Sequence, residues 1–140
     1  MLKKLSLIFL LAVGLSACKK NNNSSGCGVK TCTAEYVSFG IIYTDSQDRT
    51  ITVKDVTVIN LRTKKPVTPP PYPPAIDYIP NFQLIASDSN KDEFSSTGDD
   101  VQITATNTAT GQIKTTILKI SGGCNCHVAK LSGPDKLLFD

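Results

Sequence analysis

The chain has 140 residues, of which 40% are hydrophobic, and a formal net charge of +3 at pH 7. Two of its basic residues, Lys3 and Lys4, lie in an N-terminal segment that we expect to be removed, which leaves 13 basic and 12 acidic residues in a mature chain of 123. A net charge this close to zero gives no reason to predict a nucleic acid or an acidic molecule as a partner. The mature length is enough for one domain with its own hydrophobic core.

The first 17 residues have the three parts of a signal peptide. Residues 1–4 are positively charged, residues 5–15 are almost wholly apolar, and the small residues Ser16 and Ala17 precede Cys18. The apolar run is too short for a membrane-spanning helix, which needs about 20 residues. We therefore expect cleavage before Cys18 and export of the remaining chain.

The cleavage region Leu15-Ser16-Ala17-Cys18 resembles the lipobox of bacterial lipoprotein precursors. The resemblance implies diacylglycerol on the Cys18 sulfur, a further acyl chain such as palmitate on the new amino terminus, and hence a membrane as a partner. Two or more acyl chains give a durable anchor, whereas one gives only marginal binding. It also implies the bacterial cell envelope, and we expect the outer membrane because Lys19 stands where an Asp would favour retention in the inner membrane.

Residues 18–30 are predicted to be the lipidated cysteine and a flexible tether. The run Lys-Lys-Asn-Asn-Asn-Ser-Ser-Gly that follows Cys18 is polar and low in complexity, and such a segment does not bury enough apolar surface to fold. We predict that the folded domain covers residues 31–140.

The domain sequence predicts strands and no helix. Alternating or β-branched and aromatic runs indicate seven strands, at residues 34–43, 51–59, 76–86, 101–106, 112–120, 127–131 and 136–139. The fourth places Val101, Ile103 and Ala105 on one face, and the fifth places Ile113 and Ile117 on one face, whereas residues 51–59 have apolar side chains on both faces. Residues 107–111 predict a hairpin turn. Short strands at steady spacing predict an all-β fold, an antiparallel β-sandwich of about seven strands.

Two stretches interrupt the strand pattern. Six prolines between Pro66 and Pro74 exclude a central strand and predict a stiff polyproline II segment, so Tyr72 is a candidate partner-binding residue, although we favour a rigid connection. Residues 88–100 are polar and acidic and predict a long loop. Asp88 and Asp99 stand at the first and twelfth positions of a calcium loop, but Glu93 stands where that loop needs glycine, so we favour a solvated loop.

Four segments of the domain are similar to small immunoglobulin-like or prealbumin-like modules of bacterial lipoproteins. They are residues 37–45 (VSFGIIYTD), 54–60 (KDVTVIN), 102–107 (QITATN) and 126–134 (CHVAKLSGP). The resemblance implies a β-sandwich and supplies no catalytic residue, because a fold does not by itself define a function.

Four cysteines remain after lipidation: Cys27, Cys32, Cys124 and Cys126. In an exported chain they are expected to form two disulfides, with three connectivities available. A bridge between Cys124 and Cys126 would close a very small ring, which disulfide geometry disfavours. We therefore expect both bridges to join the first two cysteines to the last two, each closing a loop of about 90–100 residues and stabilising the fold by roughly 4–5 kcal/mol.

The alternative to disulfides is a metal site. The thiolates of Cys124 and Cys126 and the imidazole of His127, with Cys27 or Cys32 as a fourth ligand, would suit copper(I) or zinc. The spacing does not match a haem attachment site, and an oxidising compartment favours disulfides.

His127 is the only histidine in the sequence, and no motif of a nucleophilic enzyme accompanies it. We therefore predict a non-enzymatic envelope lipoprotein without a cofactor, which serves as a binding or accessory module with an envelope protein as a partner. The alternative is a metal-binding or redox lipoprotein that uses Cys124, Cys126 and His127.

Overall fold

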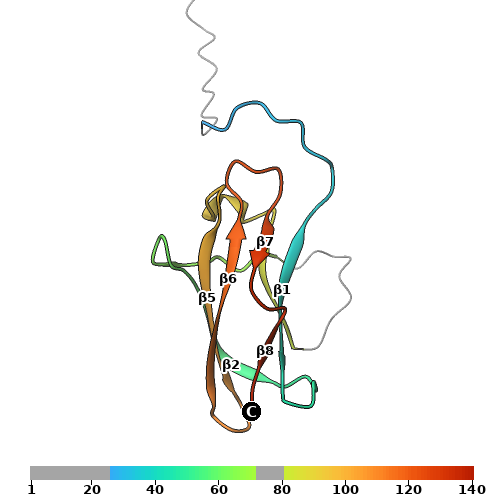
Figure 1. Cartoon of the computed structure of the whole chain (residues 1–140), viewed down its shortest axis with the longest axis vertical. Coiled ribbons are helices and arrows are strands. Elements are labelled where there is room, and N and C mark those ends of the chain that lie inside the picture. The colour runs from blue at the N-terminus through green and yellow to red at the C-terminus, as the bar shows by residue number, and fades with distance from the viewer. Residues whose placement is uncertain (1–25, 72–80) are drawn as a thin grey trace, which may run out of the picture.

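The computed structural model of the chain describes residues 26–71 and 81–140 (Figure 1). The predicted signal peptide, Cys18, most of the predicted tether and Tyr72 lie outside the described residues. No helix in the described part of the chain is long and apolar enough to span a membrane.

Eight strands and one short 3-10 helix form the described fold. They are β1 (Ser38–Thr44), β2 (Val53–Asn60), β3 (Lys65–Pro66), β4 (Phe82–Ser87), η1 (Lys91–Glu93), β5 (Asp99–Asn107), β6 (Ile113–Ser121), β7 (Ala129–Ser132) and β8 (Lys136–Leu138). One sheet has the order β4-β1-β8 and the other the order β3-β2-β5-β6-β7. All neighbours are antiparallel except β1 and β8, which run parallel. The all-β sandwich prediction is confirmed.

The core lies between the two sheets and is built from alternating residues of their inner faces. Val101, Ile103 and Ala105 of β5 are fully buried, as the alternation predicts. Side chains of β1, β6 and the C-terminal segment complete the cluster, among them Ile41, Tyr43, Leu118, Ile120 and Phe139. The Ile113 and Ile117 face of β6 instead points outward, and these side chains are 66% and 47% exposed.

Strand β2 has apolar residues on both faces because it contains a β-bulge. The register against β5 shifts between Lys54 and Thr57, and Asp55 within this interval has a φ of 52°. The extra residue reverses the alternation, so that Val53 before the bulge and Val56 after it both pack against the core. The bulge therefore explains why the sequence of residues 51–59 shows apolar side chains on both faces.

The two stretches that interrupt the predicted strands, residues 66–74 and 88–100, differ in how well they match their predictions. Pro66 pairs only at the outer edge of the five-stranded sheet, where a missing N–H leaves no ladder bond unmade, as the proline content predicts. The prediction of a solvated loop over residues 88–100 is wrong in two respects. Phe94 is buried in the core, and Asp99 and Asp100 begin strand β5. The apolar ring of Phe94 draws the middle of this loop inward.

Candidate functional site

Both disulfides lie at one end of the sandwich, where the N-terminal segment meets the β6–β7 loop (residues 122–128), opposite the end that holds the C terminus (Figure 1). Cys27 pairs with Cys124 and Cys32 pairs with Cys126, with Cα atoms 5.1 and 5.3 Å apart. The predicted pairing of the first two cysteines with the last two is confirmed. The bridges join residues 97 and 94 positions apart, so they connect the start of the domain to the loop before its last two strands.

The β6–β7 loop is itself held on the β4–β5 loop (residues 88–98). The backbone N–H of Cys124 donates to Ser96 Oγ over 3.1 Å, and the Asn125 side-chain amide donates to the Ser96 carbonyl over 2.9 Å. Gly122 packs so closely on the Lys91 carbonyl that a Cβ atom there would overlap it. The bridges therefore fasten the N-terminal segment to two loops that are already bound to each other.

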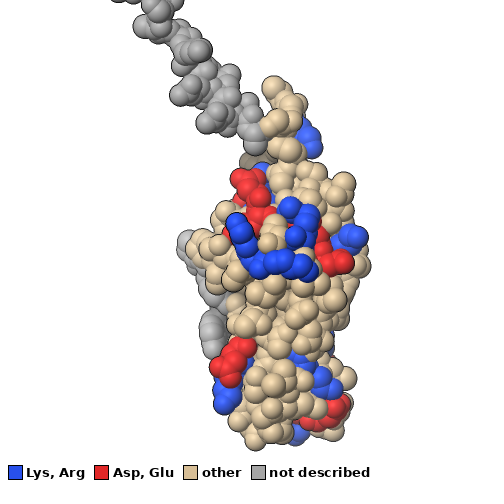
Figure 2. All heavy atoms as spheres, turned by 90° about the vertical axis from the view of Figure 1, so that its left-hand side faces the viewer, with Lys and Arg blue, Asp and Glu red and all other residues tan. Residues whose placement is uncertain are grey.

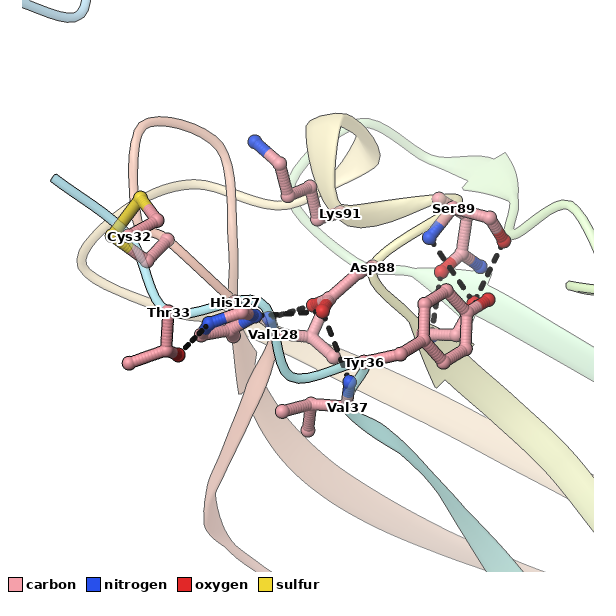
Figure 3. Close-up of polar contacts among 12 residues, drawn as sticks. Cys32, Thr33, Tyr36, Val37, Asp88, Ser89, Lys91, His127 and Val128 are labelled. Carbon is pink, nitrogen blue, oxygen red and sulfur yellow. Dashed lines mark hydrogen bonds and ion pairs between the residues drawn. A yellow bond between two sulfur atoms is a disulfide. The ribbon is translucent and has the colours of Figure 1, made fainter. Parts of the chain in front are cut away.

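Asp88 and His127 form the polar centre of this end (Figure 3). His127 Nδ1 lies 2.7 Å from Asp88 Oδ2, and Thr33 Oγ1 lies 2.9 Å from His127 Nε2. The same carboxylate accepts the backbone N–H groups of Val37 over 3.0 Å and of Val128 over 2.9 Å. Asp88 thus joins the N-terminal segment, the β4–β5 loop and the start of β7 through one group.

The environment keeps the Asp88 carboxylate ionised. Its partial burial would raise its pKa, but the hydrogen bonds from the Val37 N–H, His127 and the Val128 N–H outweigh this and hold the pKa of Asp88 below its ordinary value. If Nδ1–H donates to the carboxylate, a neutral His127 accepts a hydrogen bond from the Thr33 hydroxyl at Nε2, and a protonated His127 donates one to the Thr33 oxygen. In both protonation states the hydrogen bonds of His127 to Asp88 and to Thr33 can form.

A second polar cluster also fastens the N-terminal segment to the sandwich. The Tyr36 hydroxyl donates to Ser87 Oγ over 2.9 Å, and the Ser87 and Ser89 hydroxyls are 2.7 Å apart. The hydrogen bond to Ser87 is the main reason that the pKa of Tyr36 is lowered. Ser87 is buried, so this contact ties the segment before β1 to the end of β4.

The order threonine, histidine, aspartate is that of a nucleophile, a base and an orienting acid. The Thr33 hydroxyl, however, belongs to an exposed segment, and none of three hollows lined by described residues includes Thr33, His127 or Asp88. The contacts of Asp88, His127 and Thr33 account for fastening the N-terminal segment.

The sequence indicates His127 as a candidate but gives no sign of its partner. Neither Asp88 nor Asp99 is a free calcium ligand, because the oxygens of Asp88 accept from protein donors and those of Asp99 accept from Arg62, Ser95 and Asn60. Asp88 and His127 are 39 positions apart in the sequence, and no local pattern links them. Only the topology, which places the end of β4 beside the start of β7, brings the two together.

The metal site considered for Cys124, Cys126 and His127 would need a different covalent state. Both sulfur atoms are in disulfides, and the two nitrogens of His127 contact Asp88 and Thr33. Within residues 26–71 and 81–140 no three His, Cys, Asp or Glu side chains are grouped so as to hold a metal ion. A metal could bind this set only after both bridges were reduced, and the metal alternative stays a prediction.

Comparison of the chain with protein-family models, with curated proteins and with solved structures found no match. The resemblances to lipoprotein precursors and to immunoglobulin-like or prealbumin-like modules therefore stay predictions.

Proposed function

We propose that this chain is a lipid-anchored protein of the bacterial cell envelope whose disulfide-bridged β-sandwich is a non-enzymatic binding or accessory module. The observation that carries the proposal is that a predicted lipidation site and a disulfide to the folded domain lie close together in the N-terminal region. The lipobox-like segment would place lipid on Cys18, and the bridge at Cys27 joins the chain to the sandwich nine positions later.

This arrangement supports an anchor. Eight residues between Cys18 and Cys27 span at most about 29 Å, so a domain bound at Cys27 would stay close to the membrane surface. The disulfides fit an oxidising compartment outside the cytoplasm. In the oxidised form the cysteines are not thiolates and cannot ligate copper or zinc, so the non-enzymatic module is favoured over a metal-binding protein.

The proline-rich segment with Tyr72 is favoured as a rigid connection, and it is also the candidate element for binding a partner. Its described beginning is held firmly, because the Thr68 N–H donates to the Glu93 carboxylate over 3.0 Å and the Asn90 side chain donates to the Thr68 carbonyl over 2.9 Å. A fixed start reduces the entropy lost when such a segment binds a partner. Envelope proteins crosslinked to the intact chain should be lost when residues 69–74 are deleted, and an unchanged set would remove this segment from the proposal.

The anchor is tested by labelling with palmitate and by fractionation. The wild-type chain should incorporate the label and sediment with membranes, and Cys18→Ser should do neither. A Cys18→Ser chain that is labelled or stays with membranes would refute lipidation at this residue.

The path from anchor to domain can be tested in the same membranes. The sequence has only two glutamates, Glu35 and Glu93, and Glu35 is exposed before β1. A glutamate-specific protease should cut after Glu35, yet the domain should stay on the membrane until a reductant opens the bridges. Glu35→Gln is the matched control and should stay bound in reductant. Release without reductant would show that the bridges do not connect anchor and domain.

The metal alternative is decided by thiol counting. Protein isolated from the periplasmic side without reductant should show no free thiol and no bound copper or zinc. Two or more free thiols together with bound metal would instead favour the site at Cys124, Cys126 and His127.

A further inference from the structure

The turn between β2 and β3 (residues 61–64) presents an arginine that a buried carboxylate holds in place. Arg62 Nε donates to Asp99 Oδ1 over 2.7 Å, and the Arg62 backbone N–H donates to Asn60 Oδ1 over 2.9 Å. Asn60 in turn donates from its side-chain amide to Asp99 Oδ2 over 2.8 Å. Arg62 is therefore fixed at its backbone and its side chain by one network.

The carboxylate behind the arginine is secured on all sides. Asp99 is only 3% exposed, and it accepts the Ser95 N–H over 3.0 Å and the Ser95 hydroxyl over 2.6 Å besides its bonds to Arg62 and Asn60. Burial alone would raise the pKa of Asp99, but these hydrogen bonds hold it well below the ordinary value. The ionised carboxylate is thus a permanent orienting group for the guanidinium.

The outer edge of the guanidinium is available to a ligand. The Arg62 side chain is 53% exposed, its Nε contacts the Asp99 carboxylate, and within the described part of the chain its Nη groups have no acceptor. Arg62 lines two hollows, of about 400 and 310 Å³. Lys65 lines the first hollow and Lys119 lines the second.

The charges around Arg62 are mixed. Lys64, Lys65 and Lys119 have no carboxylate within 4.0 Å among residues 26–71 and 81–140. On the acidic side, Asp92 pairs with Lys91 at 3.3 Å, Glu93 accepts the Thr68 N–H, and Asp100 lies in the second hollow. Figure 2 shows a band of Lys and Arg side chains on this face with Asp and Glu at its ends.

We propose that Arg62, flanked by Lys65 and Lys119, is a binding site for a phosphate-type oxyanion. A guanidinium fixed through Nε offers its remaining N–H groups in a planar fork that matches two oxygens of one phosphate. Because acidic residues border the hollows, the site recognises the anion through these short hydrogen bonds and not through a strong long-range field. The affinity should therefore be modest, on the order of millimolar. The site does not depend on the proposed lipid anchor.

The test uses the full chain, in phosphatidylcholine nanodiscs if it carries lipid and in solution if it does not, titrated with inorganic phosphate at constant ionic strength. The Arg62 Nε–H resonance and the backbone amide resonances of residues 61–65 should shift and saturate, and the amide resonances also report binding in Arg62→Gln. Arg62→Gln should bind phosphate about tenfold more weakly, and Lys119→Gln, which leaves the Asp99 network intact, about threefold more weakly. The matched control is Arg49→Gln, since Arg49 also pairs with an aspartate, Asp45, at 2.6 Å but does not line either hollow.

A second arm distinguishes the source of the phosphate. In nanodiscs that contain phosphatidylglycerol, the same resonances should shift without added phosphate if a lipid headgroup occupies the site, and a shift only with added phosphate identifies a free anion. The proposal is overturned if neither arm gives a saturable shift. It is also overturned if Lys119→Gln and Arg62→Gln, with wild-type amide spectra, bind phosphate as tightly as Arg49→Gln.

Discussion

Replacing both cysteines of one bridge by alanine should cost about a third of the stability that is lost when all four are replaced. The bridges Cys27–Cys124 and Cys32–Cys126 join residues 97 and 94 positions apart. In the unfolded chain either bridge alone closes a loop of this size, which the chain-entropy relation converts into about 4.7 kcal/mol of stabilisation. The two bridges do not each supply this amount, because they are neighbours.

Once one bridge is closed, the other closes only a small additional ring. Five positions separate Cys27 from Cys32 and two separate Cys124 from Cys126, so the ring has about seven residues. The same relation gives about 2.4 kcal/mol for that ring. We therefore expect a loss of about 2.4 kcal/mol for either bridge and about 7 kcal/mol for both, which leaves about 2 kcal/mol of coupling between them.

Urea unfolding of the four proteins without reductant, followed by circular dichroism, measures these losses. Reduced wild type should match the chain without cysteines and should be close to unfolding at 37 °C, because domains of this size are stable by only about 5–15 kcal/mol. Two single losses of about 4–5 kcal/mol each that add up to the double loss would refute the shared-loop argument. Equal losses near zero would show that the bridges do not constrain the unfolded chain.

Three further perturbations test the fold. Asp88→Asn should cost about 2–3 kcal/mol in the free energy of unfolding, because the amide replaces a carboxylate that accepts from three donors. Since the pKa of Asp88 is lowered on folding, the wild type should be more stable than the variant above a pH of about 4 and should lose this advantage as the pH falls further. A difference in stability that does not depend on pH would contradict the role of the charge. Asp55→Val should be about 2 kcal/mol less stable than Asp55→Gly in urea unfolding, because the φ of 52° suits glycine and excludes a β-branched residue, and equal stabilities would contradict the bulge. Gly122→Ala should lose about 1–3 kcal/mol and slow the closing of the bridges in a thiol-trapping assay, while Gly28→Ala, which meets no neighbour, should match wild type.

The parts of the fold that the sequence predicts are those governed by local patterns. The alternation of Val101, Ile103 and Ala105 fixes the inner face of β5, since a strand has a period of two residues. The small ring that Cys124 and Cys126 would otherwise close predicts that both bridges join the first two cysteines to the last two, but it does not decide which cysteine pairs with which. Neither inference needs to know which strands are neighbours.

The parts that the sequence does not predict depend on long-range pairing. In the sequence, the bulge at Asp55 leaves only one sign, which is that the alternation of apolar residues shifts by one position between Val53 and Val56. This shift can be recognised as a bulge only when β5 is known to pair with β2. The Asp88–His127 contact spans 39 positions and the Arg62–Asp99 contact spans 37. Asp88 and Asp99 look alike in a polar segment, and only the fold gives the first to a histidine and the second to a buried network.

In the anchored form proposed above, the bridges also decide where a pull on the N terminus enters the sandwich. With Cys27–Cys124 closed, force from the membrane passes into the β6–β7 loop, which is bound to the β4–β5 loop, and residues 28–37 carry none of it. With the bridges open, the same force would reach β1, the central strand of the three-stranded sheet, from its N-terminal end. There the pairs between β1 and β4 would be opened one after another, starting at Ser38 and Ser87. In the anchored form, a bridge before the first strand would therefore protect the strand whose loss would dismantle one sheet.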